Sequence, residues 1–157
     1  MLQLLTSQLQ SGVIGEVGTG CGVASAWIVS ALLPGTSFFT VEGDPVGAAA
    51  ARALFEHMLN VRVVQGNWRD FLTHWRFGLL YAGPGSARAE EPELFIDSLR
   101  IGGLIVLDGL TPLNQVPLEL RSGADPLRDF WLNDPRLLSI EVLVSESESV
   151  ILATLVA

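Results

Sequence analysis

The feature that most limits the fold of this chain is a regular alternation of strand-like and helix-like segments. The strand-like segments are rich in β-branched, aromatic and aliphatic residues, and the segments between them have helical periodicity. The expected strands are 11–18, 36–42, 61–66, 77–83 and 102–109, and the expected helices between them are 23–33, 44–59, 68–75 and 87–100. Such alternation predicts parallel strands joined by crossover helices that cover both faces of one sheet.

The last third of the chain departs from this alternation. A proline-containing connection, 111–126, is interpreted as a lid beside the site and leads into an expected helix at 126–134. Two strand-like segments, 137–145 and 149–157, then flank a short charged turn, which is typical of an antiparallel hairpin. We therefore predict one α/β domain over 1–157, a Rossmann-like three-layer sandwich. Its seven-stranded sheet is mainly parallel, with one antiparallel strand from the C-terminal hairpin.

Composition and charge exclude several classes of protein. Apolar residues make up 49% of the chain and charged residues 17%, which predicts a folded core. The net charge of −8 argues against nucleic acid or an anionic membrane as a partner, because both bind clustered Lys and Arg. No apolar run is long enough to cross a bilayer, no signal-peptide pattern is present, and one cysteine cannot form an internal disulfide. We expect a cytoplasmic protein that acts on a small molecule. The sequence does not decide whether two copies form a homodimer.

The first expected strand ends within the stretch GEVGTGCGV, residues 15–23, which contains four glycines. A Walker phosphate loop needs a Lys-Ser/Thr pair after its second glycine, but Val23 and Ala24 follow Gly22. The dinucleotide pattern G-x-G-x-x-G also fails, because these glycines fall at every second position and a valine stands in the third glycine's place. The pattern that remains is an acid, Glu16, one spacer, and then G-x-G-x-G.

Two acidic residues indicate what this loop binds. Glu16 would repel a pyrophosphate, but it can accept a hydrogen bond from an ammonium group or order the loop through main-chain N–H groups. Glu42 ends the next expected strand, where an acid can bind both hydroxyls of a ribose. Together they favour an adenosine cofactor with a cationic tail.

Four segments, in this order and spacing, resemble the class I S-adenosylmethionine-dependent methyltransferases. The segments are GEVGTGCGVASAWIVSAL (15–32), FFTVEGDPVGAAAARALF (38–55), VRVVQGN (61–67) and LRIGGLIVLDG (99–109). Within that class the chain is most similar to bacterial O-methyltransferases of the catechol and caffeoyl-CoA type, over about residues 10–157. The resemblance implies S-adenosylmethionine as cofactor, S-adenosylhomocysteine (SAH) as product, and methyl transfer to an oxygen of a small molecule.

The resemblance also implies roles for individual residues. Glu16 and the loop glycines would line the methionine and ribose part of the cofactor, and Glu42 would hold the ribose hydroxyls. Asn67 and Trp68 would lie near the adenine, and Gly83 close to the methyl-donating centre. The full set of expected cofactor-binding residues is Glu16, Gly18, Thr19, Gly20, Cys21, Gly22, Glu42, Gly43, Asn67, Trp68 and Gly83.

The chain departs from the metal-dependent members of that family. Their hard cation is held by an Asp after the fourth strand and an Asp-Asn pair after the fifth, and a Lys acts as base. Here Gly83 and Ser86 occupy the first Asp and the Lys positions, and Asp108-Gly109 replaces Asp-Asn. One ligand of three remains, so we expect no metal site, and Asp108 is the one candidate catalytic base. The same losses raise an alternative, a non-catalytic domain that binds S-adenosylmethionine or SAH as a sensor or partner subunit.

Four further residues carry expectations that the structure tests. Cys21 is expected to be a small buried residue near the cofactor, and Trp27 to belong to the core. His57 is interpreted as a cation at the C-terminal end of a helix, and His74 as a surface or packing residue, rather than as catalytic bases. A Rossmann-like oxidoreductase is a third reading of the chain, which the glycine spacing disfavours.

Overall fold

A single mixed sheet runs through the computed structural model, which describes residues 1–86, 88, 90–117 and 125–157. Its seven strands, within these described residues, lie in the order β3-β2-β1-β4-β5-β7-β6. The strands are β1 (Gly12–Val17), β2 (Thr36–Glu42), β3 (Val61–Gln65), β4 (Phe77–Ala82), β5 (Leu99–Leu110), β6 (Leu137–Leu143) and β7 (Ser149–Leu155). All neighbouring pairs from β3 to β5 are parallel, and β7 pairs antiparallel with both β5 and β6. The predicted fold class, with one reversed strand, is therefore confirmed.

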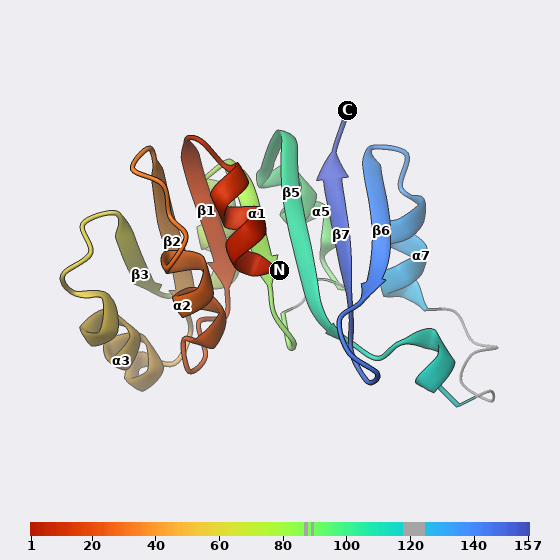
Figure 1. Cartoon of the computed structure of the whole chain (residues 1–157), viewed down its shortest axis with the longest axis horizontal. Coiled ribbons are helices and arrows are strands. Elements are labelled where there is room, and N and C mark those ends of the chain that lie inside the picture. The colour runs from red at the N-terminus through yellow and green to blue at the C-terminus, as the bar shows by residue number, and fades with distance from the viewer. Residues whose placement is uncertain (87, 89, 118–124) are drawn as a thin grey trace.

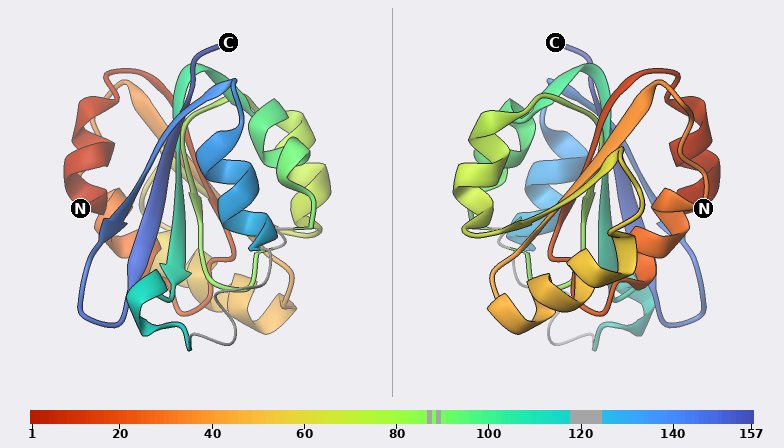
Figure 2. Two further views of the ribbon diagram at one scale, coloured as in Figure 1. Left: turned by 90° about the vertical axis from the view of Figure 1, so that its right-hand side faces the viewer. Right: turned by 90° about the vertical axis from the view of Figure 1, so that its left-hand side faces the viewer.

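Helices cover both faces of the sheet (Figures 1 and 2). The helices are α1 (Leu2–Gln8), α2 (Val23–Val29), α3 (Pro45–Phe55), α4 (Trp68–His74), α5 (Pro92–Asp97) and α7 (Pro126–Asn133), with a 3-10 turn η1 at Leu113–Gln115. Figure 2 shows α1 and α2 on one face and α4, α5 and α7 on the other, while α3 packs against β2 and β3. None of the helices described here is long and apolar enough to cross a membrane.

Two apolar clusters fill the spaces between these layers. The cluster on the α4, α5 and α7 side includes Phe77, Phe95 and Trp131, all fully buried. The smaller cluster on the α1 and α2 side is built around Ile14, Ile28 and Phe38. Because β1 and β4 are covered on both faces, their residues are apolar with few exceptions, as parallel central strands require.

Local signals explain where several elements begin. Asp44 caps α3, since its side chain accepts a hydrogen bond from Gly47 N at 2.7 Å, and Pro45 occupies the first turn. Asn67 caps α4 in the same way, through Arg69 N at 2.9 Å. Both caps come shortly after the carboxyl end of a strand. The chain therefore turns sharply at the carboxyl edge of the sheet, where the candidate site lies.

Other boundaries differ from the sequence expectations. Helix α2 ends at Val29 rather than 33, and α5 covers 92–97 of the expected 87–100, of which residues 87 and 89 lie outside the described residues. Strand β5 begins at Leu99, before the expected 102, because Gly102 with φ +77° lets the strand bulge and continue. Residues 118–124 of the expected lid also lie outside the described residues.

Trp27 is not a core residue, so that expectation is wrong. Its side chain is 54% exposed, whereas Ser25 and Ile28 are the residues of α2 that face the sheet. Ser25 faces inward because its hydroxyl donates a hydrogen bond to the buried carboxylate of Glu16 on β1. The hydrogen bond between Ser25 of α2 and Glu16 of β1 therefore sets the orientation of α2. As a result Trp27 lies on the outer face of this helix.

Candidate cofactor site

The candidate site is a cleft at the carboxyl ends of the parallel strands, where ligands bind in open α/β sheets. The cleft has a volume of about 320 Å³. It is lined by Val17, Gly18, Val41, Gly43, Gly66, Asn67, Trp68, Pro84, Gly85 and Ser86. These residues come from the ends of β1, β2, β3 and β4, so four separate turns meet at one place.

The glycine loop needs its glycines for their backbone conformation. Gly18, Gly20 and Gly22 have φ values of +86°, +53° and +80°, a region that side-chain-bearing residues rarely adopt. A Cβ atom added to Gly18 or Gly20 would meet nothing within 4 Å, so the protein leaves open space above both. The loop therefore exposes main chain toward solvent at the cleft, as close contact with a ligand requires.

Glu42 connects the glycine loop to the end of β2. One carboxylate oxygen accepts a hydrogen bond from Gly20 N at 2.9 Å, and the other accepts one from Asp44 N at 3.0 Å. Thr19 and Thr40 add a buried hydroxyl contact of 2.7 Å between the same two segments. The Glu42 carboxylate is half-buried at the end of β2, where the sequence predicts an acid that binds the ribose hydroxyls.

Glu16 does not order the loop through main-chain N–H groups. It is fully buried, it accepts a hydrogen bond from the Ser25 hydroxyl, and its Oε1 has no hydrogen-bond partner among the described residues. Burial raises the pKa of Glu16 to about 7, an effect that the hydrogen bond from Ser25 only partly offsets. A neighbouring positive charge would stabilise the ionised form of such a buried carboxyl group.

Asn67 and Trp68 line the cleft from the turn that follows β3. The Asn67 side chain caps α4, and the Trp68 ring stacks on Phe95 with ring centroids 5.4 Å apart. The Arg69 guanidinium lies 4.5 Å from the centre of the Trp68 ring. The indole is therefore held in place before any ligand arrives, and its half-buried surface borders the cleft.

The ends of β4 and β5 form the remaining part of the carboxyl edge of the sheet. Val17, Ala82 and Leu107 are level in the sheet register, so Gly83 begins the turn after β4 at the level where Asp108 continues β5. The Tyr81 hydroxyl donates to Asp108 Oδ2 at 2.6 Å, and Gly109 N donates to Asp108 Oδ1 at 2.8 Å.

These contacts fix the orientation of the Asp108 carboxylate. Asp108 borders a second cavity of about 360 Å³, shared with Trp27 and Glu148. Burial and the bond to Asp108 raise the pKa of Tyr81 well above its usual range, so its hydroxyl stays protonated.

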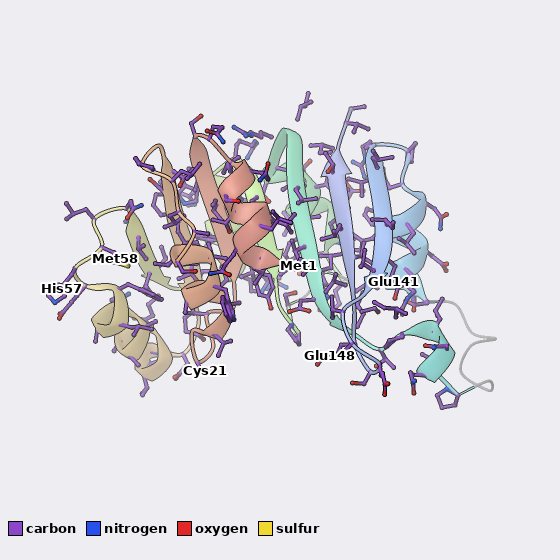
Figure 3. The ribbon with its side chains drawn as sticks, in the orientation of Figure 1. Met1, Cys21, His57, Met58, Glu141 and Glu148 are labelled. Carbon is purple, nitrogen blue, oxygen red and sulfur yellow. The ribbon has the colours of Figure 1, made fainter. Side chains whose placement is uncertain are left out.

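The structure brings together part of the predicted set. Gly18, Gly43, Asn67 and Trp68 line the cleft. The structure places Gly20, Cys21 and Gly22 against α3 in a separate hollow, Thr19 and Glu16 beneath the loop, and Gly83 buried beside Tyr81. Cys21 is exposed at the outer edge of the loop, so the expectation of a buried cysteine is wrong (Figure 3). His57 is exposed just beyond α3, and His74 is exposed at the end of α4.

The expected cofactor-binding residues did not include the turn that closes the cleft. Pro84, Gly85 and Ser86 border it, and the Ser86 hydroxyl donates to Gly83 O at 2.9 Å. The glycine-proline composition after β4 was the available signal, because such a turn at a strand's carboxyl end faces the ligand. No sequence pattern predicted the contact of Tyr81 with Asp108, since a tyrosine within an apolar strand is typical of the core.

The sheet order, the glycine loop after β1 and the acid after β2 define the fold of the class I S-adenosylmethionine-dependent methyltransferases. A scan against protein-family models finds no match, and no curated protein sequence matches the chain. Solved structures do match. An O-methyltransferase from Bacillus cereus in complex with SAH is 21% identical with a TM-score of 0.74, over 99% of this chain and 79% of that one.

Two further solved structures have the same architecture. The O-methyltransferase TomG from Streptomyces achromogenes, in complex with S-adenosylmethionine and involved in tomaymycin synthesis, is 20% identical with a TM-score of 0.73. That match covers 99% of this chain and 78% of TomG. A methyltransferase from Geobacter sulfurreducens is 17% identical with a TM-score of 0.78, over 99% of this chain and 76% of that one. At these identities the likeness establishes the fold.

Proposed function

We propose that this protein transfers the methyl group of S-adenosylmethionine to an oxygen atom of a small-molecule acceptor, without a metal ion. The observation that carries the proposal is the position of Glu42. Its carboxylate joins the glycine loop to the end of β2, next to a cleft that open main chain and a fixed indole border. Two structural neighbours were solved in complex with SAH and with S-adenosylmethionine, which supports the choice of ligand.

The residues of the cleft fit such a cofactor. Glu42 would accept hydrogen bonds from the ribose hydroxyls, and the Trp68 indole would contact the adenine. The open space above Gly18 would admit the ligand close to the main chain, and the buried carboxylate of Glu16 lies on β1, two residues before Gly18. A cationic ligand would lower the pKa of Glu16 and offset the cost of its ionisation.

The bound cofactor would supply an electrophilic methyl group on a positively charged sulfur. This chain would then have to position an acceptor oxygen in line with that methyl group and accept the hydroxyl proton. Asp108 is the candidate base, because Tyr81 and Gly109 fix its carboxylate one strand away from Gly83. Neither contact uses all the lone pairs of the carboxylate, so Asp108 can still accept a proton.

Two observations support a metal-independent reaction. The described residues contain no group of three or more His, Cys, Asp and Glu side chains that could hold an ion. Gly109 also has φ +70°, and a Cβ atom there would lie 2.4 Å from Pro84 Cγ. A side-chain ligand therefore has no room at position 109 unless the turn at Pro84 moves. Calorimetric titration with Mg²⁺ or Ca²⁺ in the presence of SAH tests this, and stoichiometric micromolar binding contradicts it.

Thermal denaturation with SAH tests the cofactor site. SAH at 100 times its dissociation constant is expected to stabilise the protein by about 2.7 kcal/mol. Glu42→Ala should lose most of this shift, whereas Glu56→Ala, an exposed carboxylate beyond α3, should keep it. Absence of a shift in the wild-type protein, or an equal shift in Glu42→Ala, contradicts the assignment.

A non-catalytic domain that binds the same cofactor is the second candidate function. The observation that favours it is the loss of the metal-ligand and lysine positions at Gly83, Ser86 and Gly109. Incubation with methyl-labelled S-adenosylmethionine and a panel of phenols, carboxylic acids and amines separates the two candidates. Transfer of label to any acceptor removes the non-catalytic reading, and SAH binding without transfer across the panel favours it.

A further inference from the structure

The two edge strands of the sheet present different residues to solvent. In β3 the exposed residues are Arg62 and Gln65, which are polar. In β6 they are Leu138, Ile140 and Leu143, with exposed fractions of 73%, 59% and 62%. Natural edge strands are usually short or carry charged residues or proline, because free main-chain N–H and C=O groups pair readily with another strand. The β3 edge follows this rule, and the β6 edge does not.

The outer edge of β6 has no strand beside it among the described residues. β6 is the last strand in the sheet order, and α7 packs against one of its faces (Figures 1 and 2). At the two ends of β6, main-chain groups of Arg136 and Val144 form hydrogen bonds toward the β7 side of the hairpin. Main-chain groups alternate in direction along a strand, so those of Ser139, Glu141 and Leu143 point away from β7, toward the open edge.

The sequence of β6 is self-complementary about Ile140, which is its central residue. Two copies that pair antiparallel around a two-fold axis at Ile140 align the whole of Leu137–Leu143 with itself. Every cross-strand pair then joins residues of the same character: Ile140 with Ile140, Leu138 with Val142, Leu137 with Leu143, and Ser139 with Glu141. Apolar cross-strand pairs stabilise a sheet, so this alignment favours a second copy of the same strand over an unrelated one.

The neighbouring alignments fit less well. An axis at Glu141 would place two carboxylates directly opposite each other, which is destabilising. An axis at Ser139 would place Leu137 opposite Glu141 of the second copy. Both also leave the end of each strand unpaired. The axis at Ile140 is therefore the one that the residues of β6 support.

Ser139 gives independent support for the axis at Ile140. Its Oγ is buried and has no hydrogen-bond partner among the described residues. Glu141 is held by the Arg128 guanidinium at 2.8 Å and by the Ser149 hydroxyl at 2.6 Å, so its carboxylate stays charged and in place. In the alignment about Ile140, Ser139 lies opposite Glu141 of the second copy, with Cβ atoms about 5 Å apart. Rotation of the Ser139 side chain toward the open edge would then give its hydroxyl an acceptor.

We propose that two copies of this chain associate through β6, antiparallel about Ile140, so that their sheets join into one continuous sheet. The two-fold axis is perpendicular to the sheet, so both α7 helices lie on the same face of the joined sheet. The contact is one strand wide, which is small for a permanent interface. We therefore expect a reversible dimer with a dissociation constant of roughly 1–100 μM.

A disulfide cross-link at the axis tests the proposal. The main-chain groups of Ile140 point toward β7, so Ile140 and its copy form a non-hydrogen-bonded pair with Cα atoms about 4.5 Å apart, within the range that a disulfide spans. Cys21 is exposed and is replaced in every variant by Cys21→Ser. Under mild oxidation, Ile140→Cys should form a covalent dimer at least about tenfold faster than Leu59→Cys. Leu59 is the matched control, because it is 104% exposed and lies beside β3 at the opposite end of the sheet.

Mixed cross-links test the alignment of the two strands. Leu138 lies opposite Val142 rather than opposite its own copy. A mixture of Leu138→Cys and Val142→Cys should therefore form the mixed covalent dimer readily, whereas Leu138→Cys alone should cross-link slowly. If Leu138→Cys alone cross-links as fast as Ile140→Cys, the alignment about Ile140 is wrong.

Sedimentation velocity over a concentration series measures the association without cysteine chemistry. Ile140→Lys should weaken dimer formation at least about tenfold, because a lysine on an edge strand opposes pairing. Leu59→Lys should associate as the wild-type protein does. Circular dichroism establishes that each variant is folded, and if Ile140→Lys is not, the cross-linking rates decide.

Two results would overturn the proposal. One is a wild-type protein that stays monomeric up to about 200 μM, with Ile140→Cys cross-linking no faster than Leu59→Cys. The other is a dimer that Ile140→Lys leaves intact, which would assign the interface to a different surface. Neither result bears on the cofactor site, because SAH binding is measured separately on the same variants.

Discussion

The substitution Glu16→Gln should remove a large part of the pH dependence of stability. Glu16 is fully buried, and its Oε1 has no hydrogen-bond partner in the part of the chain that the structure describes. Burial raises its pKa to about 7 from an ordinary value of 4.5. Between these two values the folded protein keeps a proton that the unfolded chain has lost. The contribution of Glu16 is therefore fully present below pH 4.5, declines as pH rises, and is gone above pH 7.

The magnitude follows from the difference between the two pKa values. It corresponds to about 3 kcal/mol of unfolding free energy between pH 4.5 and 7.5. Gln has nearly the same shape and does not ionise, although its amide leaves one donor unsatisfied, which costs about 1–3 kcal/mol at every pH. The variant should thus be less stable than the wild-type protein at pH 4.5, and the gap should close or reverse by pH 7.5.

Urea unfolding without cofactor, followed by circular dichroism from pH 4.5 to 8, measures this change. The informative quantity is the difference in unfolding free energy between variant and wild type, because other titrating groups cancel in it. Glu146→Gln, which replaces an exposed carboxylate in the hairpin turn, is the matched control for the loss of one carboxylate. A Glu16→Gln difference that varies by less than about 1 kcal/mol over this range refutes the reasoning.

Three further substitutions test the contacts that build the fold, each by urea unfolding at pH 7. Asp44→Ala removes the cap of α3 and should cost about 1 kcal/mol. Arg128→Ala leaves Glu141 of β6 without its ion pair to α7, removes the hydrogen bond to Thr111 O, and should cost about 3 kcal/mol or more. Tyr81→Phe removes the donor to Asp108 and should cost about 2 kcal/mol, with SAH binding unchanged. A cost under about 0.5 kcal/mol in any of them contradicts the contact concerned.

Elements whose signals are local could be predicted from the sequence. Strand β2 has the expected bounds, Thr36–Glu42, because a β-branched and aromatic run ends at Asp44-Pro45, which begins a helix. The hairpin of β6 and β7 was equally readable, since two apolar runs flank a short charged turn. The order of the parallel strands was not predicted, because no local pattern in the sequence encodes it.

Features that depend on contacts between elements could not be read from the sequence. Trp27 was expected in the core because it is large and apolar, but the partner that Glu16 requires places Ser25 on the inner face instead. Cys21 follows Gly20 in a loop whose outward course depends on three left-handed glycines. Arg88 lay within an expected helix, where nothing marks a residue whose side chain turns back to the end of β4.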